Sequence, residues 1–185
     1  MIFTQFKTIG RDLFSQSLIS SHSGNLSIRM GDRIFITRRG CQLGNLEEHD
    51  VVETGLSKND RATPMASIEL PTHRAIYKAT QANAIIHAHP LHAIALSLSK
   101  KKIQPNCVEG EFLGLIPVLG WGTEVKAGGL TDIIAEALKQ HHIVVVKGHG
   151  TFATGQLLEE ALHYTSGFEA NCRVLCLMKS MNSRG

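Results

Sequence analysis

The chain has 185 residues, 43% of them hydrophobic and 19% charged, which suits a single soluble globular domain over residues 1–185. The net charge is only +3, and the one basic cluster, "SKKK" at 99–102, has no basic helix or aromatic ladder beside it, which argues against nucleic-acid binding. No stretch approaches the roughly 18 to 20 apolar residues of a membrane span, and the N-terminus lacks the features of a signal peptide. The four cysteines form no C-x-x-C pair, so we expect a reduced, cytoplasmic setting.

Apolar periodicity divides the first half of the chain into helices and strands. We predict a helix over 2–19, a β-hairpin over 26–37, a loop with a short helical turn over 38–50, a strand over 51–54, a turn-rich segment over 57–67 and a helix over 69–78. Ser67 is the expected N-terminal cap of that last helix.

The second half continues the alternation. We predict a strand over 84–89, a helix over 91–99, a strand over 115–120, a helix over 128–140 opened near Thr131, a strand over 143–150, a brief strand or turn over 151–155 and a long amphipathic helix over 157–181. Strands and helices interleave without repeats, which indicates one layered α/β domain.

Two polar segments precede or follow strands in the first half. In "SGNLS" (23–27), Gly24 and Asn25 can expose backbone N–H groups to an anion, although Gly-Asn is also ordinary turn chemistry. In "TRRG" (37–40), Arg38 and Arg39 suit a phosphate or carboxylate, although arginines at a strand end are often simply solvated.

Glu69 stands at the start of a predicted helix, where the helix N-terminus favours a carboxylate. His73 follows four residues later and so lies on the same helix face. The pair is interpreted either as a hydrogen bond that supports a site or as an ordinary helix-surface pair.

The strand "AIIHAHP" (84–90) carries two histidines at its end. Side chains alternate in a strand, so His87 and His89 point the same way, and Pro90 suits the first turn of a following helix. Two neutral imidazoles at a strand end predict a metal site of the zinc type. Two histidines hydrogen-bonded at the surface are the alternative.

His149 also follows a buried, β-branched strand, and glycines flank it. Two strands that each end in histidine can bring three imidazoles together. Three histidine ligands with an open fourth position are typical of a catalytic metal site. A plain turn histidine is the alternative.

Four motifs in this order, "SGNLS", "IELPTH", "HAHP" and "KGHG", give the sequence a resemblance to a known family. It resembles the class II (zinc-dependent) aldolases of the fuculose-1-phosphate aldolase and ribulose-phosphate epimerase superfamily over nearly the whole chain. The resemblance implies one Zn²⁺ held by His87, His89 and His149, with Glu69 as the catalytic acid/base. It also implies a three-layer α/β/α fold with a mainly antiparallel sheet.

The resemblance further implies a small phosphorylated sugar as substrate and a C4-type homotetramer with active sites at the subunit interfaces. Phosphate contacts map to Gly24, Asn25, Gly40 and Ser67. Arg39 stands where the aldolases usually have a threonine, and it can replace that contact or alter the substrate.

Other departures from the family pattern bear on the function. The aldolases commonly have two serines before the glutamate, whereas this chain has Ser67-Ile68. No tyrosine matches the catalytic tyrosine of the neighbouring subunit, and 108–116 carry "VEGEFLGLI" instead. The epimerases have an aspartate at the position of Glu69, which disfavours an epimerase, and the intact histidine set disfavours an inactive adducin-like domain.

We therefore expect a zinc-dependent lyase that cleaves an aldol resembling L-fuculose-1-phosphate into dihydroxyacetone phosphate and an aldehyde. Two alternatives remain: a dehydratase of the methylthioribulose-phosphate type on the same scaffold, and a metal-binding scaffold protein without turnover.

Overall fold

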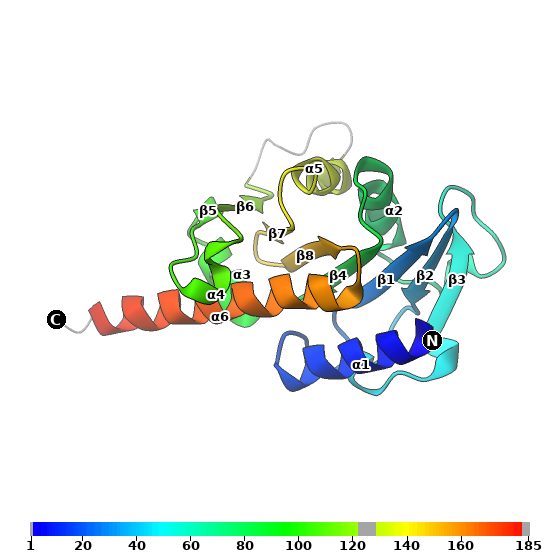
Figure 1. Cartoon of the computed structure of the whole chain (residues 1–185), viewed down its shortest axis with the longest axis horizontal. Coiled ribbons are helices and arrows are strands. Elements are labelled where there is room, and N and C mark those ends of the chain that lie inside the picture. The colour runs from blue at the N-terminus through cyan, green and yellow to red at the C-terminus, as the bar shows by residue number, and fades with distance from the viewer. Residues whose placement is uncertain (1, 122–128, 183–185) are drawn as a thin grey trace.

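The computed structural model describes residues 2–121 and 129–182, and its centre is an eight-stranded sheet (Figure 1). The strand order is β3-β2-β1-β4-β8-β7-β6-β5. The strands are β1 (Asn25–Met30), β2 (Arg33–Thr37), β3 (Val51–Gly55), β4 (Ala84–Ala88), β5 (Lys102–Ile103), β6 (Ile116–Leu119), β7 (Ile143–Val146) and β8 (Gly150–Gly155). Neighbouring strands are antiparallel except β6 and β7, which confirms the expected sheet.

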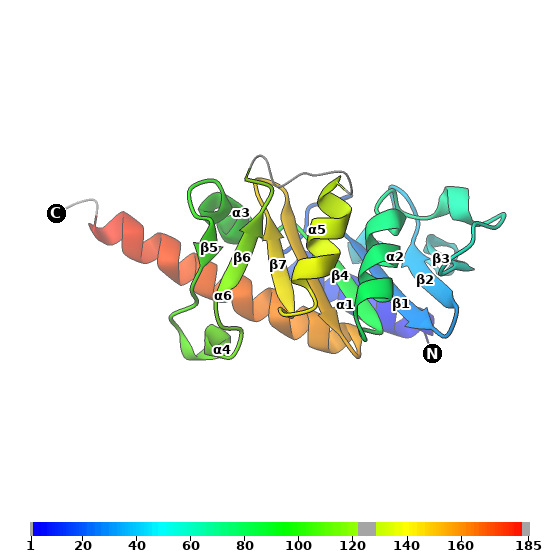
Figure 2. The ribbon, with the colours of Figure 1, turned by 90° about the horizontal axis from the view of Figure 1, so that it is seen from above.

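Helices cover both faces of the sheet, which gives the three layers (Figures 1 and 2). The α-helices are α1 (Ile2–Ser15), α2 (Leu70–Ala79), α3 (Leu91–Ser97), α4 (Val108–Glu111), α5 (Gly129–Ala137) and α6 (Leu158–Asn182). Helices α1, α3 and α6 bury apolar side chains with one face of the sheet. Helices α2 and α5 pack on the other face, so two apolar cores enclose the sheet.

Most predicted elements are present, with shifted ends. Helix α1 ends at Ser15 rather than at residue 19, because Ser17 adopts a left-handed conformation with φ of 58°. Leu18 then turns back, its N–H donates to the carbonyl of Leu13, and its side chain enters the core.

The C-terminal half shows larger differences from the predicted elements. The expected strand 143–150 is two strands, because residues 147–149 form a tight turn between β7 and β8. The segment predicted as a brief strand or turn is β8, which is buried throughout and pairs with both β4 and β7. Elements β5 and α4 were not predicted, and both lie at the edge of the molecule beyond β6 (Figure 2). Helix α5 already includes Gly129, so Thr131 does not open it, while residue 128 lies outside the described residues.

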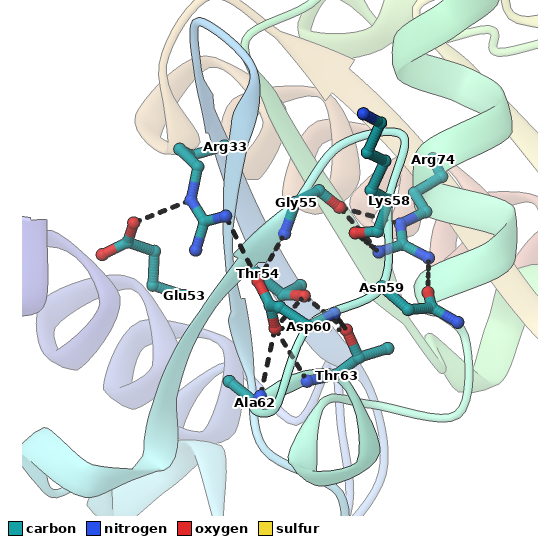
Figure 3. A network of polar contacts seen from close by, with 10 residues as sticks. All are labelled: Arg33, Glu53, Thr54, Gly55, Lys58, Asn59, Asp60, Ala62, Thr63 and Arg74. Carbon is teal, nitrogen blue, oxygen red and sulfur yellow. Dashed lines mark hydrogen bonds and ion pairs between the residues drawn. The ribbon is translucent and has the colours of Figure 1, made fainter.

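A polar network fixes the connection between β3 and α2 (Figure 3). Asp60 accepts hydrogen bonds from the Thr54 hydroxyl and from the backbone N–H groups of Gly55, Ala62 and Thr63. The guanidinium of Arg74 on α2 clamps the carbonyls of Gly55 and Lys58. The segment leading into α2 is therefore held from both of its ends.

Helix α6 packs on the sheet only along its first part. The buried side chains end at Cys172, and the last turns project beyond the body of the molecule (Figure 1). Exposed apolar side chains on this projection include Leu177 and Met181. Within residues 2–121 and 129–182, no helix has the length and apolarity needed to cross a bilayer.

Candidate metal centre

Strand register brings the first site residues together. Asn25 on β1 lies directly opposite His87 on β4, and His87 lies opposite Phe152 on β8. Directly opposed residues of antiparallel strands share a face, here the face covered by α2. The imidazole of His87 stacks on the Phe152 ring, with centroids 4.2 Å apart.

One hydrogen bond sets the tautomer of His87. Its Nδ1 lies 2.9 Å from the backbone carbonyl of Thr151, which can only accept, so Nδ1 carries the proton. Burial, together with the neighbouring His89 and His149, lowers the pKa of His87 well below its usual value, so the ring is neutral. Nε2 is therefore unprotonated, and its lone pair can bind a metal ion.

His89 and His149 complete a cluster of three imidazoles. The Nε2 atoms of His87 and His89 are 2.9 Å apart, and His149 has ring centroids 4.8 Å from His87 and 5.1 Å from His89. His149 occupies the turn between β7 and β8, so the hairpin delivers it to the end of β4. Burial lowers the pKa of His89 to about 4 and also lowers the pKa of His149.

The hairpin turn approaches β4 closely only because Gly150 has no side chain. A Cβ at Gly150 would collide with the carbonyl oxygen of Ala88 and lie 3.0 Å from the ring of His89. Gly24, expected as a phosphate contact, has a similar constraint: its φ is +78°, and a Cβ there would lie 2.8 Å from the His87 carbonyl. Both glycines let backbone pack against the histidine strand.

Glu69 faces the histidines from the start of α2. Its Oε2 lies 3.8 Å from Nε2 of His87, and its Oε1 lies 3.9 Å from Nε2 of His149. Oε2 is buried without a hydrogen-bond partner among the described residues. Burial raises the pKa of this carboxyl to about 6. The carboxylate therefore lies close to the three histidines, but none of them forms a hydrogen bond with its buried oxygen.

The prediction that Ser67 caps α2 is wrong in detail. Glu69 occupies the cap position of α2, and its side chain makes no capping hydrogen bond. The hydroxyl of Ser67 instead accepts from the N–H of Glu69, at 3.3 Å. Because the backbone N–H of Ser67 donates to the Thr37 carbonyl, Ser67 is tied to the end of β2.

These groups fit a metal ion. The ligand nitrogens of His87, His89 and His149 lie within 4.8 Å of one another. Two imidazole nitrogens on a tetrahedral Zn²⁺, each at about 2.0 to 2.1 Å, would be about 3.3 Å apart, close to the 2.9 Å between His87 and His89. The unpartnered oxygen of Glu69 and the neutral histidines indicate a site arranged for a cation that the three nitrogens would hold.

A cavity of about 270 Å³ opens over the cluster. Its lining contains every residue that the sequence assigned to the site: Gly24, Asn25, Arg39, Gly40, Ser67, Glu69, His87, His89 and His149. Arg38, which the sequence also suggested for an anion, lines the cavity too. The lining residues that sequence reasoning missed, or left without a role, are His22, Ser23, Cys41 and Ile68. All four lie within two positions of predicted site residues, so proximity to a motif was the available signal.

Arg38 and His73 have surroundings that the sequence did not indicate. The guanidinium of Arg38 binds Asp50 through Nε and Nη2, at 3.1 and 2.9 Å, so it already has an anionic partner within the protein. Arg39 is exposed and forms no ion pair within the described residues. His73 does not pair with the Glu69 side chain; it is fully buried and bonds to Asn25 and Ser27 instead.

The sequence and the fold were compared with known proteins. Residues 5–176 match the family described as Class II Aldolase and Adducin N-terminal domain. The chain is 32% identical over 160 residues to an L-fuculose phosphate aldolase of Methanocaldococcus jannaschii, covering 85% of this chain and 86% of that protein. It is 29% identical over 187 residues to a methylthioribulose-1-phosphate dehydratase of Acidiphilium cryptum, covering 89% and 88%. The crystal structure of L-fuculose-1-phosphate aldolase from Thermus thermophilus superposes with a TM-score of 0.90 at 33% identity, covering 98% of this chain and 96% of that one.

Proposed function

This chain belongs to the class II aldolase and adducin N-terminal domain family and is an aldolase-type enzyme, and on that premise we propose that it is a zinc-dependent lyase. Its substrate is a small sugar phosphate resembling L-fuculose-1-phosphate, and its products are dihydroxyacetone phosphate and an aldehyde. The observation that carries the proposal is one cavity that holds three neutral histidines and a carboxylate whose buried Oε2 has no hydrogen-bond partner among the described residues.

We propose that His87, His89 and His149 hold one Zn²⁺ per chain. A Lewis acid bound there stabilises the negative charge that develops on substrate oxygen atoms as the C–C bond breaks. The hydrogen bond from His87 Nδ1 to the carbonyl of Thr151 orients that ring, and its Nε2 would be the ligand atom.

Glu69 is the proposed acid/base. As the C–C bond breaks, the carboxylate takes the proton of the hydroxyl whose oxygen becomes the aldehyde carbonyl, and the resulting carboxylic acid then gives a proton to the carbon of the dihydroxyacetone phosphate fragment. In the metal-free protein, burial raises the pKa of this carboxyl to about 6, closer to neutral pH than that of an exposed glutamate. General acid–base catalysis of this kind contributes roughly 10² to 10⁴ in rate.

The phosphate group is proposed to bind in the same cavity. Gly24, Asn25, Gly40 and Ser67 are among its lining residues, and Arg39 adds a cation. Arginine suits phosphate because its planar fork of N–H donors matches two phosphate oxygens.

We also propose that the single domain over residues 1–185 assembles as a homotetramer with active sites between subunits. The exposed apolar side chains at the end of α6, Leu177 at 56% and Met181 at 75%, are compatible with a contact between copies. Light scattering at micromolar concentration should give four times the mass of one chain, and a monomer mass would contradict the assembly.

A substrate panel tests the lyase. Zinc-loaded protein is incubated with L-fuculose-1-phosphate and related ketose 1-phosphates, and dihydroxyacetone phosphate is followed with a coupled assay. We expect release of dihydroxyacetone phosphate together with an aldehyde, and loss of that release after chelation. No release from any member of the panel would overturn the proposed reaction.

A dehydratase is the second candidate, because the Acidiphilium cryptum relative named as one matches almost the whole chain. Methylthioribulose-1-phosphate is therefore included in the panel. A diketo product without C–C cleavage would favour the dehydratase, and an aldehyde product would exclude it as the main activity. Stoichiometric zinc with no turnover of either kind would instead favour a binding protein.

A further inference from the structure

A chain of four hydrogen-bonded side chains lies behind the cavity and is not explained by the chemistry above. Nε2 of His73 lies 2.6 Å from Oδ1 of Asn25, and Nδ1 of His73 lies 2.6 Å from Oγ of Ser27. Oγ of Ser27 lies 2.7 Å from the Tyr77 hydroxyl. His73 and Ser27 are fully buried and Tyr77 is 1% exposed, whereas Asn25 is 6% exposed and lines the cavity.

The orientation of the Asn25 amide sets the direction of each hydrogen bond. Oδ1 of Asn25 can only accept, so Nε2 of His73 donates to it. Burial lowers the pKa of His73 to about 3, so the ring is neutral and Nδ1 must accept from the Ser27 hydroxyl. The Ser27 oxygen then accepts from the Tyr77 hydroxyl. The donors thus run one way, from Tyr77 through Ser27 and His73 to Asn25.

These hydrogen bonds hold the Asn25 amide with its oxygen toward His73. Because His73 holds Oδ1 at the back, the NH₂ group is the end available to a ligand. An amide turned over would present its carbonyl oxygen, which repels an anion. The chain therefore selects the orientation in which Asn25 donates hydrogen bonds.

The elements that supply these residues suit such a role. Asn25 and Ser27 are two apart on β1 and so share the face toward α2, while His73 and Tyr77 are four apart on α2 and share the face toward β1. The four hydrogen-bonded side chains thus link the central strand β1 to helix α2, which begins beside Glu69. A buried polar network is favourable only when each of its polar groups has a hydrogen-bond partner. Here the hydrogen bonds between the four side chains are short.

We propose that His73 is a positioning residue that, with Ser27 and Tyr77 behind it, fixes the Asn25 amide as a hydrogen-bond donor to the phosphate of the substrate. The inference rests on the proposed function for the identity of the ligand, but the chain of hydrogen bonds does not depend on which bond of the sugar is broken. His73 touches neither the substrate nor the metal ion and acts only through Asn25.

A double-mutant cycle on phosphate affinity tests the inference. Zinc-loaded wild type, Asn25→Ala, His73→Leu and the double variant are titrated with inorganic phosphate by calorimetry. Each single variant should weaken phosphate binding roughly 10-fold, as expected for losing a hydrogen bond to a charged group. The double variant should be no weaker than Asn25→Ala, because His73 acts only through that residue.

A conservative variant separates positioning from packing. The amide of glutamine in His73→Gln can donate to Asn25 and accept from Ser27, so its phosphate affinity should stay within about 3-fold of wild type. A residue needed only for packing would give the same phosphate affinity in the leucine and glutamine variants. Additive losses in the cycle, or a leucine variant with wild-type affinity, would overturn the inference.

Nitrogen NMR of the wild type keeps the inference testable if His73→Leu does not fold. We expect the Nε2–H tautomer for His73. The Nδ1–H tautomer would contradict the proposed direction of the hydrogen bonds. Absence of phosphate binding to the wild type would also overturn it. If the double-mutant cycle gives the expected result but the protein cleaves no sugar phosphate, only the proposed lyase reaction is refuted. If the protein is a lyase but its phosphate affinity does not change in the His73 variants, only the positioning role of His73 is refuted.

Discussion

Asp60 and Glu69 lie on the same connection between β3 and α2, yet their carboxylates have opposite surroundings. Asp60 accepts several hydrogen bonds and pairs with Arg33 at 3.2 Å (Figure 3). Burial alone would raise the pKa of Asp60, but hydrogen bonds from Thr54, Ala62 and Thr63 and from Arg33 lower it to about 2. Glu69 has no such donors, so burial raises its pKa to about 6.

The difference separates a structural carboxylate from one prepared for chemistry. A carboxylate whose lone pairs are filled stays ionised and holds a loop in place. A buried carboxylate with an unpartnered oxygen beside three neutral histidines lowers the stability of the protein, and such an arrangement is typical of functional sites. The stability supplied around Asp60 helps to hold Glu69 in its unfavourable place.

The largest effect is expected for Glu69→Gln. Glutamine keeps the shape of the side chain but cannot exchange a proton with carbon, so turnover of the substrate found in the panel should fall by roughly 10² or more while zinc content stays near that of wild type. The measurement is kcat with metal analysis on the same samples. Asp60→Asn is the matched control and should keep most of its turnover. Near wild-type turnover by the glutamine variant would leave Glu69 a structural residue.

The same substitution should stabilise the metal-free protein. The pKa of Glu69 rises from 4.5 to about 6 on folding, so the folded state binds more protons than the unfolded state between these values, and its stability falls as pH rises through this range. Glutamine avoids this loss, which amounts to about 2 kcal/mol at about 1.4 kcal/mol per pKa unit. Urea unfolding of metal-free protein should show this gain above pH 6 and little gain at pH 4. A loss of stability at pH 7 would contradict the desolvation of Glu69.

Asp60→Asn should have the opposite effect on stability. The pKa of Asp60 falls from 3.8 to about 2 on folding, so its contribution is present above pH 3.8 and is lost as pH falls through 2. The asparagine amide keeps one acceptor oxygen, so its NH₂ group faces either the Gly55 N–H or the N–H groups of Ala62 and Thr63, and the midpoint of thermal unfolding should fall by a few degrees at pH 7. The difference from wild type should shrink toward pH 2. Equal midpoints at pH 7 would show that the network does not stabilise the connection.

The smallest effect is expected for Arg39→Ala. Arg39 is exposed, so its attraction to a phosphate is screened by water, and a loss of about 5-fold or less in phosphate affinity is expected. The loss should diminish as salt is added, and kcat should be unchanged. Phosphate titrations at low and high ionic strength measure both. Arg11, which is exposed on α1, provides an arginine control away from the cavity.

The candidate site was predicted mostly from local patterns. Side-chain alternation in "AIIHAHP" correctly placed His87 and His89 on one face, and a strand ending in glycines correctly drew attention to His149. The resemblance supplied Glu69 and the antiparallel sheet, which local periodicity did not specify. Glu69 lies 3.8 Å from His87 and 3.9 Å from His149.

The features that the sequence did not predict depend on contacts between distant parts of the chain. The register that sets Asn25 opposite His87 joins strands far apart in sequence, so the partners of His73 could not be read from the four-residue spacing to Glu69. Residues 151–155 were predicted as a brief strand or turn, and pairing with both β4 and β7 makes β8 a central strand. The turn-rich segment before α2 was recognised, whereas the Asp60 network needed Arg33 from another strand.

Metal content of matched histidine variants tests the central claim most directly. Wild type, His87→Ala and His92→Ala are equilibrated with zinc, desalted and analysed for metal per chain, with circular dichroism as a check of folding. His92 is the control because it bonds to Glu169 at 2.7 Å and lies outside the cluster. We predict close to one zinc per chain in wild type and His92→Ala and almost none in His87→Ala. Full zinc content in a folded His87→Ala protein would contradict the assignment of the metal centre.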